Sequence, residues 1–240
     1  MRTLPANGLV VANGRDENLE RVLKRGCWTP VERFGGEGGW GARETRNGFE
    51  VLLEGASQGT VSWEVAGEHN RMNALAALAA ARHAGVPVAR GVEALGAFRN
   101  VKRRLEVRGV VNGVTVYDDF AHHPTAIDAT IEALRSRVGA ARILAVLEPR
   151  SNTMKLGIWK DALAASLDRA AGVFCYTANL GWDAAGALAP LGRKCTTADD
   201  IGAMVEAIAR EARAGDHVLV MSNGGFGGIH EKLLARLARN

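Results

Sequence analysis

A stretch in the middle of the chain combines two carboxylates with two imidazoles where a strand is expected to end. These four ionisable residues are Asp118, Asp119, His122 and His123, and Pro124 then opens a helical pattern. Ligands bind at the carboxyl edge of a parallel sheet, where N–H groups at a helix start suit phosphate. A carboxylate can accept from ribose or hold a metal through water, and an imidazole can meet a base or a phosphate. The stretch indicates a nucleotide site, although the aspartates and one histidine could instead only cap the helix.

Two more polar segments follow apolar runs and are therefore expected at the same sheet edge. They are Leu147–Gly157 and Met221–His230. Basic residues in the first could bind the carboxylates of a peptide, and Ser222 with Asn223 in the second could donate hydrogen bonds to them. Lys155 could alternatively be a solvated lysine at a helix start. The candidate substrate-binding residues are Arg150, Asn152, Lys155, Ser222, Asn223 and Phe226.

The elements that must position these segments are clearest in the second part of the chain. From Gly109 onward, short β-branched runs alternate with helical patterns, which is typical of parallel βαβ units. Helical spacing begins at Ile127, Leu156 and Ile201, and Asp199 is the predicted N-cap of the third helix. Residues 99–240 are therefore expected to form a doubly wound, mostly parallel α/β sheet. Its predicted strands are Val110–Tyr117, Arg142–Glu148, Gly172–Tyr176 and His217–Ser222, with a weaker one near Lys194.

Residues 1–98 have a different pattern and predict a separate domain. A glycine-rich turn at Gly35–Gly41 precedes two runs that predict antiparallel strands. The helical pattern stops near Phe98–Val101, which places the domain boundary there. The predicted elements are strand Leu9–Ala12, helix Glu17–Lys24, strands near Gly48–Leu53 and Thr60–Val65, and helix Asn70–Ala84 ending at Gly85.

Composition bounds the class of protein. The 240 residues are 47% hydrophobic, and no run of about 18 apolar residues occurs that could cross a membrane. The net charge of +4 comes from 30 basic residues scattered among 26 acidic ones, and only 5% of residues are aromatic, so nucleic acid is not an expected partner. Three cysteines without a C-x-x-C pair suit a reducing compartment, and with no apolar signal-peptide core the protein is expected to be cytoplasmic.

Three short motifs occur together in a fixed order. Gly67–Asn73 fits G-x-H-N-x-x-N, Arg104–Glu106 fits Arg-x-Glu/Asp, and the residues Asp119, His122 and Pro124 fit Asp-x-x-His-x-Pro. In this combination the chain resembles the Mur ligase superfamily, in which the first motif ends the central domain and the other two open the carboxyl-terminal one. The resemblance implies that residues 1–98 are the carboxyl-terminal part of a central ATP-binding domain. It also implies a Rossmann-like carboxyl-terminal domain over residues 99–240.

The resemblance implies roles for individual residues. In the family's pattern Asn70 and Asn73 contact adenine, which suits a side chain that carries a donor and an acceptor together. Arg104 aligns best with an arginine that reaches the γ-phosphate of ATP, and Arg103 is a near alternative. Which aspartate meets the nucleotide is left open. The candidate nucleotide-binding residues are His69, Asn70, Asn73, Arg103, Asp118 and Asp119, and the candidate catalytic residues are Arg104 and His122.

Other segments resemble one branch of the superfamily. Leu147–Gly157, Met221–His230, Val11–Leu19 and Gly26–Trp28 are similar to the ligases that join L-alanyl-γ-D-glutamyl-meso-diaminopimelate to UDP-N-acetylmuramate. The implied reaction is ADP-forming, passes through an acyl phosphate, uses ATP and Mg²⁺, and serves peptidoglycan recycling. The alternatives are the sister branch, which adds L-alanine to the same sugar nucleotide, and a peptide-binding module without catalysis. A nicotinamide-dependent oxidoreductase is disfavoured because the glycines near residue 225 fit no G-x-G-x-x-G.

The chain departs from the family in one respect. No G-x-x-x-x-G-K-[ST] segment occurs in the 240 residues, so the lysine and hydroxyl that hold phosphate and magnesium in such loops are not among them. The family's metal ligands and the domain that holds the UDP group have no counterpart here either, so no residue of this chain is expected to bind metal. By itself, the chain is expected to be inactive.

Overall fold

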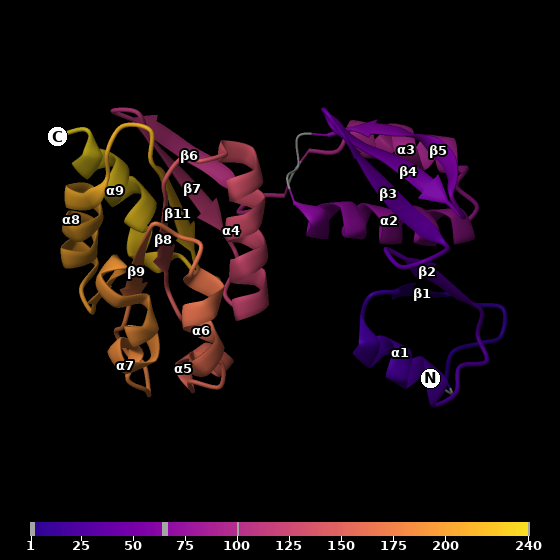
Figure 1. The fold of residues 1–240 in the computed structure, drawn as a ribbon, viewed down its shortest axis with the longest axis horizontal. Helices are drawn as coiled ribbons and strands as arrows, with labels where there is room; N and C mark the ends of the chain where they lie inside the picture. The colour runs from indigo at the N-terminus through magenta and orange to yellow at the C-terminus, as the bar shows by residue number, and fades with distance from the viewer. Residues whose placement is uncertain (1–2, 64–66, 100, 240) are drawn as a thin grey trace. The chain divides into compact units, whose positions relative to one another are not determined.

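The computed structural model describes residues 3–63, 67–99 and 101–239. The chain divides into two compact units, Met1–Asn100 and Val101–Asn240 (Figure 1). No helix within the described ranges is long and apolar enough to span a bilayer.

Unit 1 (Met1–Asn100) is a five-stranded sheet in the order β1-β2-β3-β4-β5 with two helices packed on it. The first three strands are parallel and the last two pair antiparallel. Trp40, Phe49 and Val61 are fully buried under Leu75 and Leu78, which α2 presents at helical spacing. The elements are β1 (Val10–Asn13), α1 (Glu17–Lys24), β2 (Val31–Phe34), β3 (Trp40–Thr45), β4 (Gly48–Leu53), β5 (Ala56–Ser62), α2 (Glu68–His83) and α3 (Val88–Gly96).

The sequence predictions for unit 1 are confirmed for α1 and β4 and overlap β1 and α2 within two residues. The predicted strand Thr60–Val65 overlaps the end of β5, and Val65 lies outside the described residues. Strands β2 and β3 and helix α3 have no counterpart among the predictions. The two strands flank the glycine-rich turn and carry charged residues, so neither forms an apolar run in the sequence.

Unit 2 (Val101–Asn240) is a six-stranded sheet in the order β10-β9-β8-β11-β7-β6, parallel except for β6. Figure 1 shows α4 and α6 on one side of this sheet and α8 and α9 on the other. The doubly wound fold expected from the sequence is thereby confirmed. The elements are β6 (Glu106–Val111), β7 (Val114–Asp119), α4 (Pro124–Val138), β8 (Ile143–Leu147), α5 (Asn152–Lys155), α6 (Lys160–Leu167), β9 (Gly172–Tyr176), α7 (Ala184–Leu188), β10 (Cys195–Ala198), α8 (Ile201–Glu211), β11 (His217–Met221) and α9 (Ile229–Leu237).

Three predictions in unit 2 are wrong in detail. The predicted strand Val110–Tyr117 is a hairpin of two strands, because Asn112 and Gly113 have φ of 49° and 78° and turn the chain between β6 and β7. The N-cap of α8 is Asp200 rather than Asp199, and it accepts a hydrogen bond from the N–H of Ala203. Leu156, expected on a helix face, lies after α5 and is 74% exposed.

Candidate functional site

Strands β7, β8 and β11 end at one edge of the sheet of unit 2, which is here called the rim. The N–H of Ser222 donates to the carbonyl of Asp119 at 3.1 Å, and the N–H of Glu148 donates to the carbonyl of Met221 at 3.0 Å. These bonds bring the segments that follow the three strands together. The expectation that Asp119, Ser222 and the segment after β8 share an edge is therefore confirmed.

Asp119 points toward α4 and is only 2% exposed. Its carboxylate accepts from the N–H of Ala121 and of Leu105, each at 2.8 Å, and from the hydroxyl of Thr130 at 3.4 Å. Burial raises the pKa of Asp119, and these donors only partly offset that effect. The carboxylate is thus engaged within the fold, where it fixes the segments on both sides of it.

Asp118 points to the opposite face because successive side chains of a strand alternate. Its carboxylate lies 3.2 Å from Nε of Arg103 and 3.4 Å from Nε2 of His230, which stands in the first turn of α9. Burial by itself raises the pKa of Asp118, but His230 and Arg103 outweigh it and hold the pKa below its ordinary value. The two neighbouring aspartates therefore serve different faces of the sheet.

The two histidines have different roles. His123 is the N-cap of α4, accepts from the N–H of Thr125 at 3.3 Å, and stacks edge-on against Trp159 with ring centres 4.4 Å apart. The alternative that one histidine caps the helix is thus confirmed for His123. His122 instead contacts the carbonyl of Phe120 through Nδ1 at 2.9 Å and keeps part of its ring accessible.

The segments after β8 and β11 are joined through a hydroxyl. Ser222 donates to the Glu148 carboxylate, and its oxygen accepts from the N–H of Gly224 at 2.9 Å. The guanidinium of Arg150 lies directly against Gly224, since a Cβ there would stand 1.6 Å from one of its nitrogens. The amide oxygen of Asn223 is buried and has no hydrogen-bond partner among the described residues. This part of the rim offers the exposed Arg150 to a ligand, whereas the amide oxygen of Asn223 is enclosed.

The other predicted substrate residues are separated by the structure. Asn152 and Lys155 are exposed and lie three residues apart on the single turn of α5, so they share a face. Phe226 is 1% exposed and packs in the core against Tyr176, with ring centres 5.6 Å apart. We correct the assignment of Phe226 for this reason, because a side chain enclosed in the core cannot touch a ligand. The assignment of Ser222 is corrected as well, because Ser222 is 1% exposed and its hydroxyl donates to Glu148.

Sequence reasoning missed Glu148 and His230, and both had a signal. Glu148 directly follows the apolar strand β8, and Asp119 is likewise the acidic residue at the end of β7. His230 ends a segment singled out for its resemblance, and its depth in the fold could not be read from the sequence.

In unit 1, the predicted adenine contacts lie at the start of α2. Asn70 is partly buried, whereas His69 and Asn73 are exposed. Arg15 contacts the carboxylate of Glu68 and the carbonyl of Gly35, and so ties the loops after β1 and β2 to this helix start.

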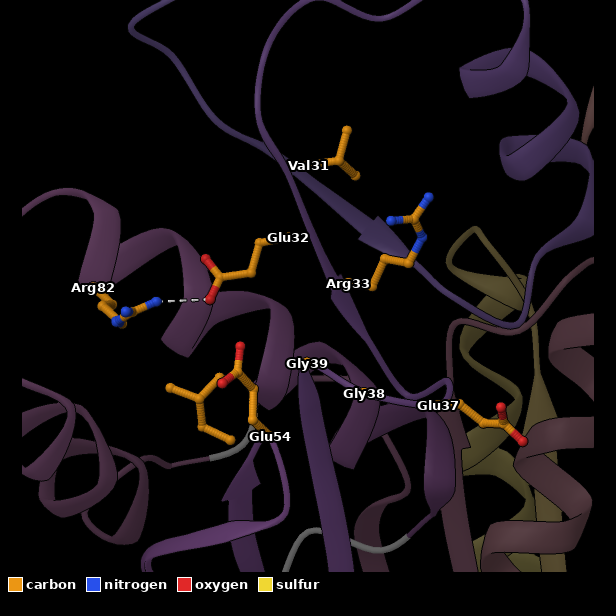
Figure 2. Close-up of a pocket in the computed structure, with 9 residues that line it drawn as sticks. Val31, Glu32, Arg33, Glu37, Gly38, Gly39, Glu54 and Arg82 are labelled. Atoms are coloured by element: carbon orange, nitrogen blue, oxygen red, sulfur yellow. Dashed lines mark hydrogen bonds and ion pairs between the residues drawn. The ribbon is translucent and has the colours of Figure 1, made fainter.

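A cavity of about 310 Å³ lies elsewhere in unit 1, and Figure 2 shows the residues that line it. Glu32 and Arg82 point toward one another across it and form an ion pair of 2.8 Å. Glu32 also accepts from the indole N–H of Trp40 at 2.6 Å. The cavity contains none of the residues predicted to bind nucleotide or peptide.

The part of the chain that the structure describes contains no group of three or more His, Cys, Asp or Glu placed to hold a metal ion. The rim instead offers two exposed arginines, Arg104 beside Phe120 and Arg150 against Gly224. These cations therefore lie at the carboxyl edge of a doubly wound sheet, the edge at which ligands bind in α/β proteins of this class.

Residues 103–224 match the family model described as "Mur ligase, glutamate ligase domain". The chain belongs to the Mur ligase family.

Two curated relatives are similar along the chain. They are the UDP-N-acetylmuramate--L-alanyl-gamma-D-glutamyl-meso-2,6-diaminoheptandioate ligases of Escherichia coli K12, 50% identical over 100% of this chain, and of Haemophilus influenzae, 46% identical over 99%. The crystal structure of a murein peptide ligase from Psychrobacter arcticus covers the whole chain at 36% identity with a TM-score of 0.77. The chain spans 53% of each of these three proteins, about half of their length.

Proposed function

We propose that this chain forms part of an ATP-dependent, ADP-forming ligase that joins L-alanyl-γ-D-glutamyl-meso-diaminopimelate to UDP-N-acetylmuramate in peptidoglycan recycling. The observation that carries the proposal is the meeting of two chemically different sets of side chains on one rim. Arg104 and His122 flank the end of β7, and Arg150 and Asn223 follow β8 and β11. A nucleotide and a peptide amine must approach one another in such a reaction, and a shared edge lets one fold position both.

On the nucleotide side, Arg104 is the residue we assign to phosphate. It is exposed, and its guanidinium carbon lies 5.9 Å from the centre of the Phe120 ring. A guanidinium in this position can bridge phosphate oxygens and offset the charge that moves during phosphoryl transfer. Asp118 and Asp119 are buried, so their part is to hold the segments that carry Arg104 and His122.

On the acceptor side, Arg150, Asn152 and Lys155 would bind the carboxylates of the peptide. All three side chains are exposed. A tripeptide that carries several carboxylates fits this group of cations.

Unit 1 would contribute the adenine contacts through Asn70 and Asn73, as the carboxyl-terminal part of a central ATP-binding domain. His69 stands beside them at the start of α2. The phosphate-loop lysine and the magnesium ligands would come from residues outside this sequence, so Mg²⁺ would be held elsewhere in the complete enzyme. We propose a cytoplasmic location, where both substrates and ATP occur.

The proposal is tested by ligation assays on the full-length protein that contains this chain. With ATP and UDP-N-acetylmuramate supplied, the tripeptide is expected to be ligated and free L-alanine is not. The rival function, addition of L-alanine to UDP-N-acetylmuramate, is supported by relatives such as the UDP-N-acetylmuramate--L-alanine ligase of Streptomyces avermitilis, 37% identical over 82% of this chain. Ligation of L-alanine in preference to tripeptide would establish the rival. Peptide binding without any ATP turnover would instead favour a non-catalytic binding module.

A further inference from the structure

A group of three charged or ionisable side chains, two of them buried and the third partly buried, lies directly beneath the rim. Asp118 is at its centre, with Arg103 on one side and His230 on the other. The side chains of Asp118 and His230 are 6% and 8% exposed. Nε2 of His230 lies 3.4 Å from the carboxylate without the alignment of a hydrogen bond, and no other described residue satisfies it. His230 is thus aimed at Asp118 from α9.

A buried carboxylate is costly unless cations or donors compensate it. Asp118 has two such partners, and they come from segments far apart in the sequence: Arg103 precedes β6, and His230 opens α9. The contact therefore connects the start of unit 2 to one of its last helices. The imidazole and Arg103 face the carboxylate from two sides, so loss of the imidazole would free the carboxylate to rotate and Arg103 would be less restrained.

The segment that carries Arg103 has an unfavourable backbone conformation. Arg103 and Leu105 have φ of 60° and 47°, in the left-handed region that L-residues avoid. Three hydrogen bonds hold the segment: the Arg103 N–H donates to Glu106 at 2.8 Å, the Leu105 N–H donates to Asp119 at 2.8 Å, and the Arg103 carbonyl accepts from Phe120 at 2.9 Å. The side chain of Arg103 turns inward, and Arg104 between the two strained residues is exposed.

Arg103 also reaches the acceptor side of the rim. One of its terminal nitrogens donates to the carbonyl of Ser222 at 2.5 Å, and the hydroxyl of the same serine contacts Glu148. A single guanidinium therefore links the segment that displays Arg104 with the loop that follows β11. The position of this guanidinium is set by Asp118, which His230 in turn faces.

We propose that His230 is a positioning residue that acts through Asp118 to fix Arg103, so that Arg104 is displayed outward and the Ser222 loop is held at the rim. The link from His230 to Arg103 stands on its own geometry. Its effect on ligation rests on the proposed function of Arg104. Neither His230 nor Asp118 touches the reacting groups in this scheme.

The first test measures the Arg103 side chain directly in the 240-residue protein. The Nε–H of a guanidinium held in an ion pair exchanges slowly with water, and NMR follows its rate. We expect His230→Leu to speed this exchange about tenfold, equivalent to about 1.4 kcal/mol. His230→Gln should keep the wild-type rate, because its side-chain nitrogen lies the same number of bonds from Cα as Nε2 of histidine.

His230→Asn is the matched control, because it has the same amide group but is one carbon shorter. It should exchange as fast as the leucine variant. Equal rates in the glutamine and asparagine variants would overturn the proposal, and this comparison holds even if the leucine variant does not fold. An Arg103 rate within twofold of wild type in a folded leucine variant would overturn it as well.

Arg104→Ala separates this inference from the proposed function. It should leave the Arg103 exchange rate unchanged in the 240-residue protein while raising the KM for ATP in the full-length enzyme. His230→Leu should raise the same KM, and His230→Gln should restore it. An unchanged KM in Arg104→Ala would refute the phosphate role of Arg104, and the exchange rates alone would then decide the role of His230.

Discussion

Adding one methyl group at Gly224 tests whether Arg150 binds the peptide. A Cβ at this position would stand 1.6 Å from a terminal nitrogen of Arg150, 2.5 Å from its guanidinium carbon and 2.6 Å from its Cδ. The arginine must therefore leave its position in Gly224→Ala. Gly224 has no positive φ, so the backbone accepts alanine without strain.

The expected loss can be estimated from the contact that Arg150 would make. A hydrogen bond between an arginine and a carboxylate contributes about 1.5–3 kcal/mol, so the KM for tripeptide should rise about 10- to 100-fold. The KM for ATP should stay within twofold of wild type. Because Arg150 is exposed and can swing into solvent, the free energy of unfolding should change by less than about 1 kcal/mol.

Gly225→Ala is the control for this experiment. Gly225 is the next residue, has a φ of −79°, and a Cβ there would meet no described atom within 4 Å. It should behave as wild type in ligation and in urea unfolding. If Gly224→Ala and Gly225→Ala had the same KM for tripeptide, the assignment of Arg150 to the peptide would be refuted.

Three further predictions concern stability and reactivity. The pKa of Asp118 lies below its ordinary value of 3.8, so its charge stabilises the fold above that pH and this contribution is lost as the pH falls below it. In urea unfolding between pH 2 and 5, the free energy of unfolding should therefore fall less steeply with acid in Asp118→Asn than in the wild type. Burial raises the pKa of the Cys175 thiol to about 12. Mass spectrometry after iodoacetamide treatment at pH 8 should therefore find Cys27 alkylated and Cys175 unmodified. Modification of Cys175 in the folded protein would contradict this prediction. Gly113→Ala should lower the free energy of unfolding by about 1–2 kcal/mol, and by more than Gly55→Ala, because both glycines have a φ near 80° in a hairpin turn but only a Cβ at Gly113 presses on a neighbour, Ala214 at 3.0 Å.

Continuous apolar runs made parts of the fold predictable. Strands β8, β9 and β11 are buried on both faces, so their sequences read as unbroken apolar stretches and their bounds follow within one or two residues. Strand β6 lies at the edge of its sheet and has exposed residues on both faces, so it lacks such a run. The signal for the hairpin is the Asn112-Gly113 pair, which is typical of a tight turn between two antiparallel strands.

The sequence predicted which loops form the site, but it did not predict which side chains of those loops contact one another. Topology alone places the ends of parallel strands at one edge, which is why Asp119 and Ser222 could be grouped from the sequence. The sequence does not reveal which side chains turn inward. Of two adjacent arginines, Arg103 is partly buried and Arg104 is exposed. They differ because Arg103 and Leu105 adopt left-handed conformations, which no sequence rule anticipates. Phe226 is buried for a similar reason, with a φ of 40° that turns it into the core.

The placement of Asp118 and Asp119 on opposite faces of β7 limits the insertions and deletions that this strand can accept during evolution. Strand side chains alternate with a period of two, so deleting or inserting one residue within β7 would exchange the two carboxylates. Asp118 would then face Thr130 of α4, and Asp119 would face His230 of α9, with neither set of contacts in register. A library of length variants should therefore tolerate no single-residue indel in this strand, even where it accepts point substitutions.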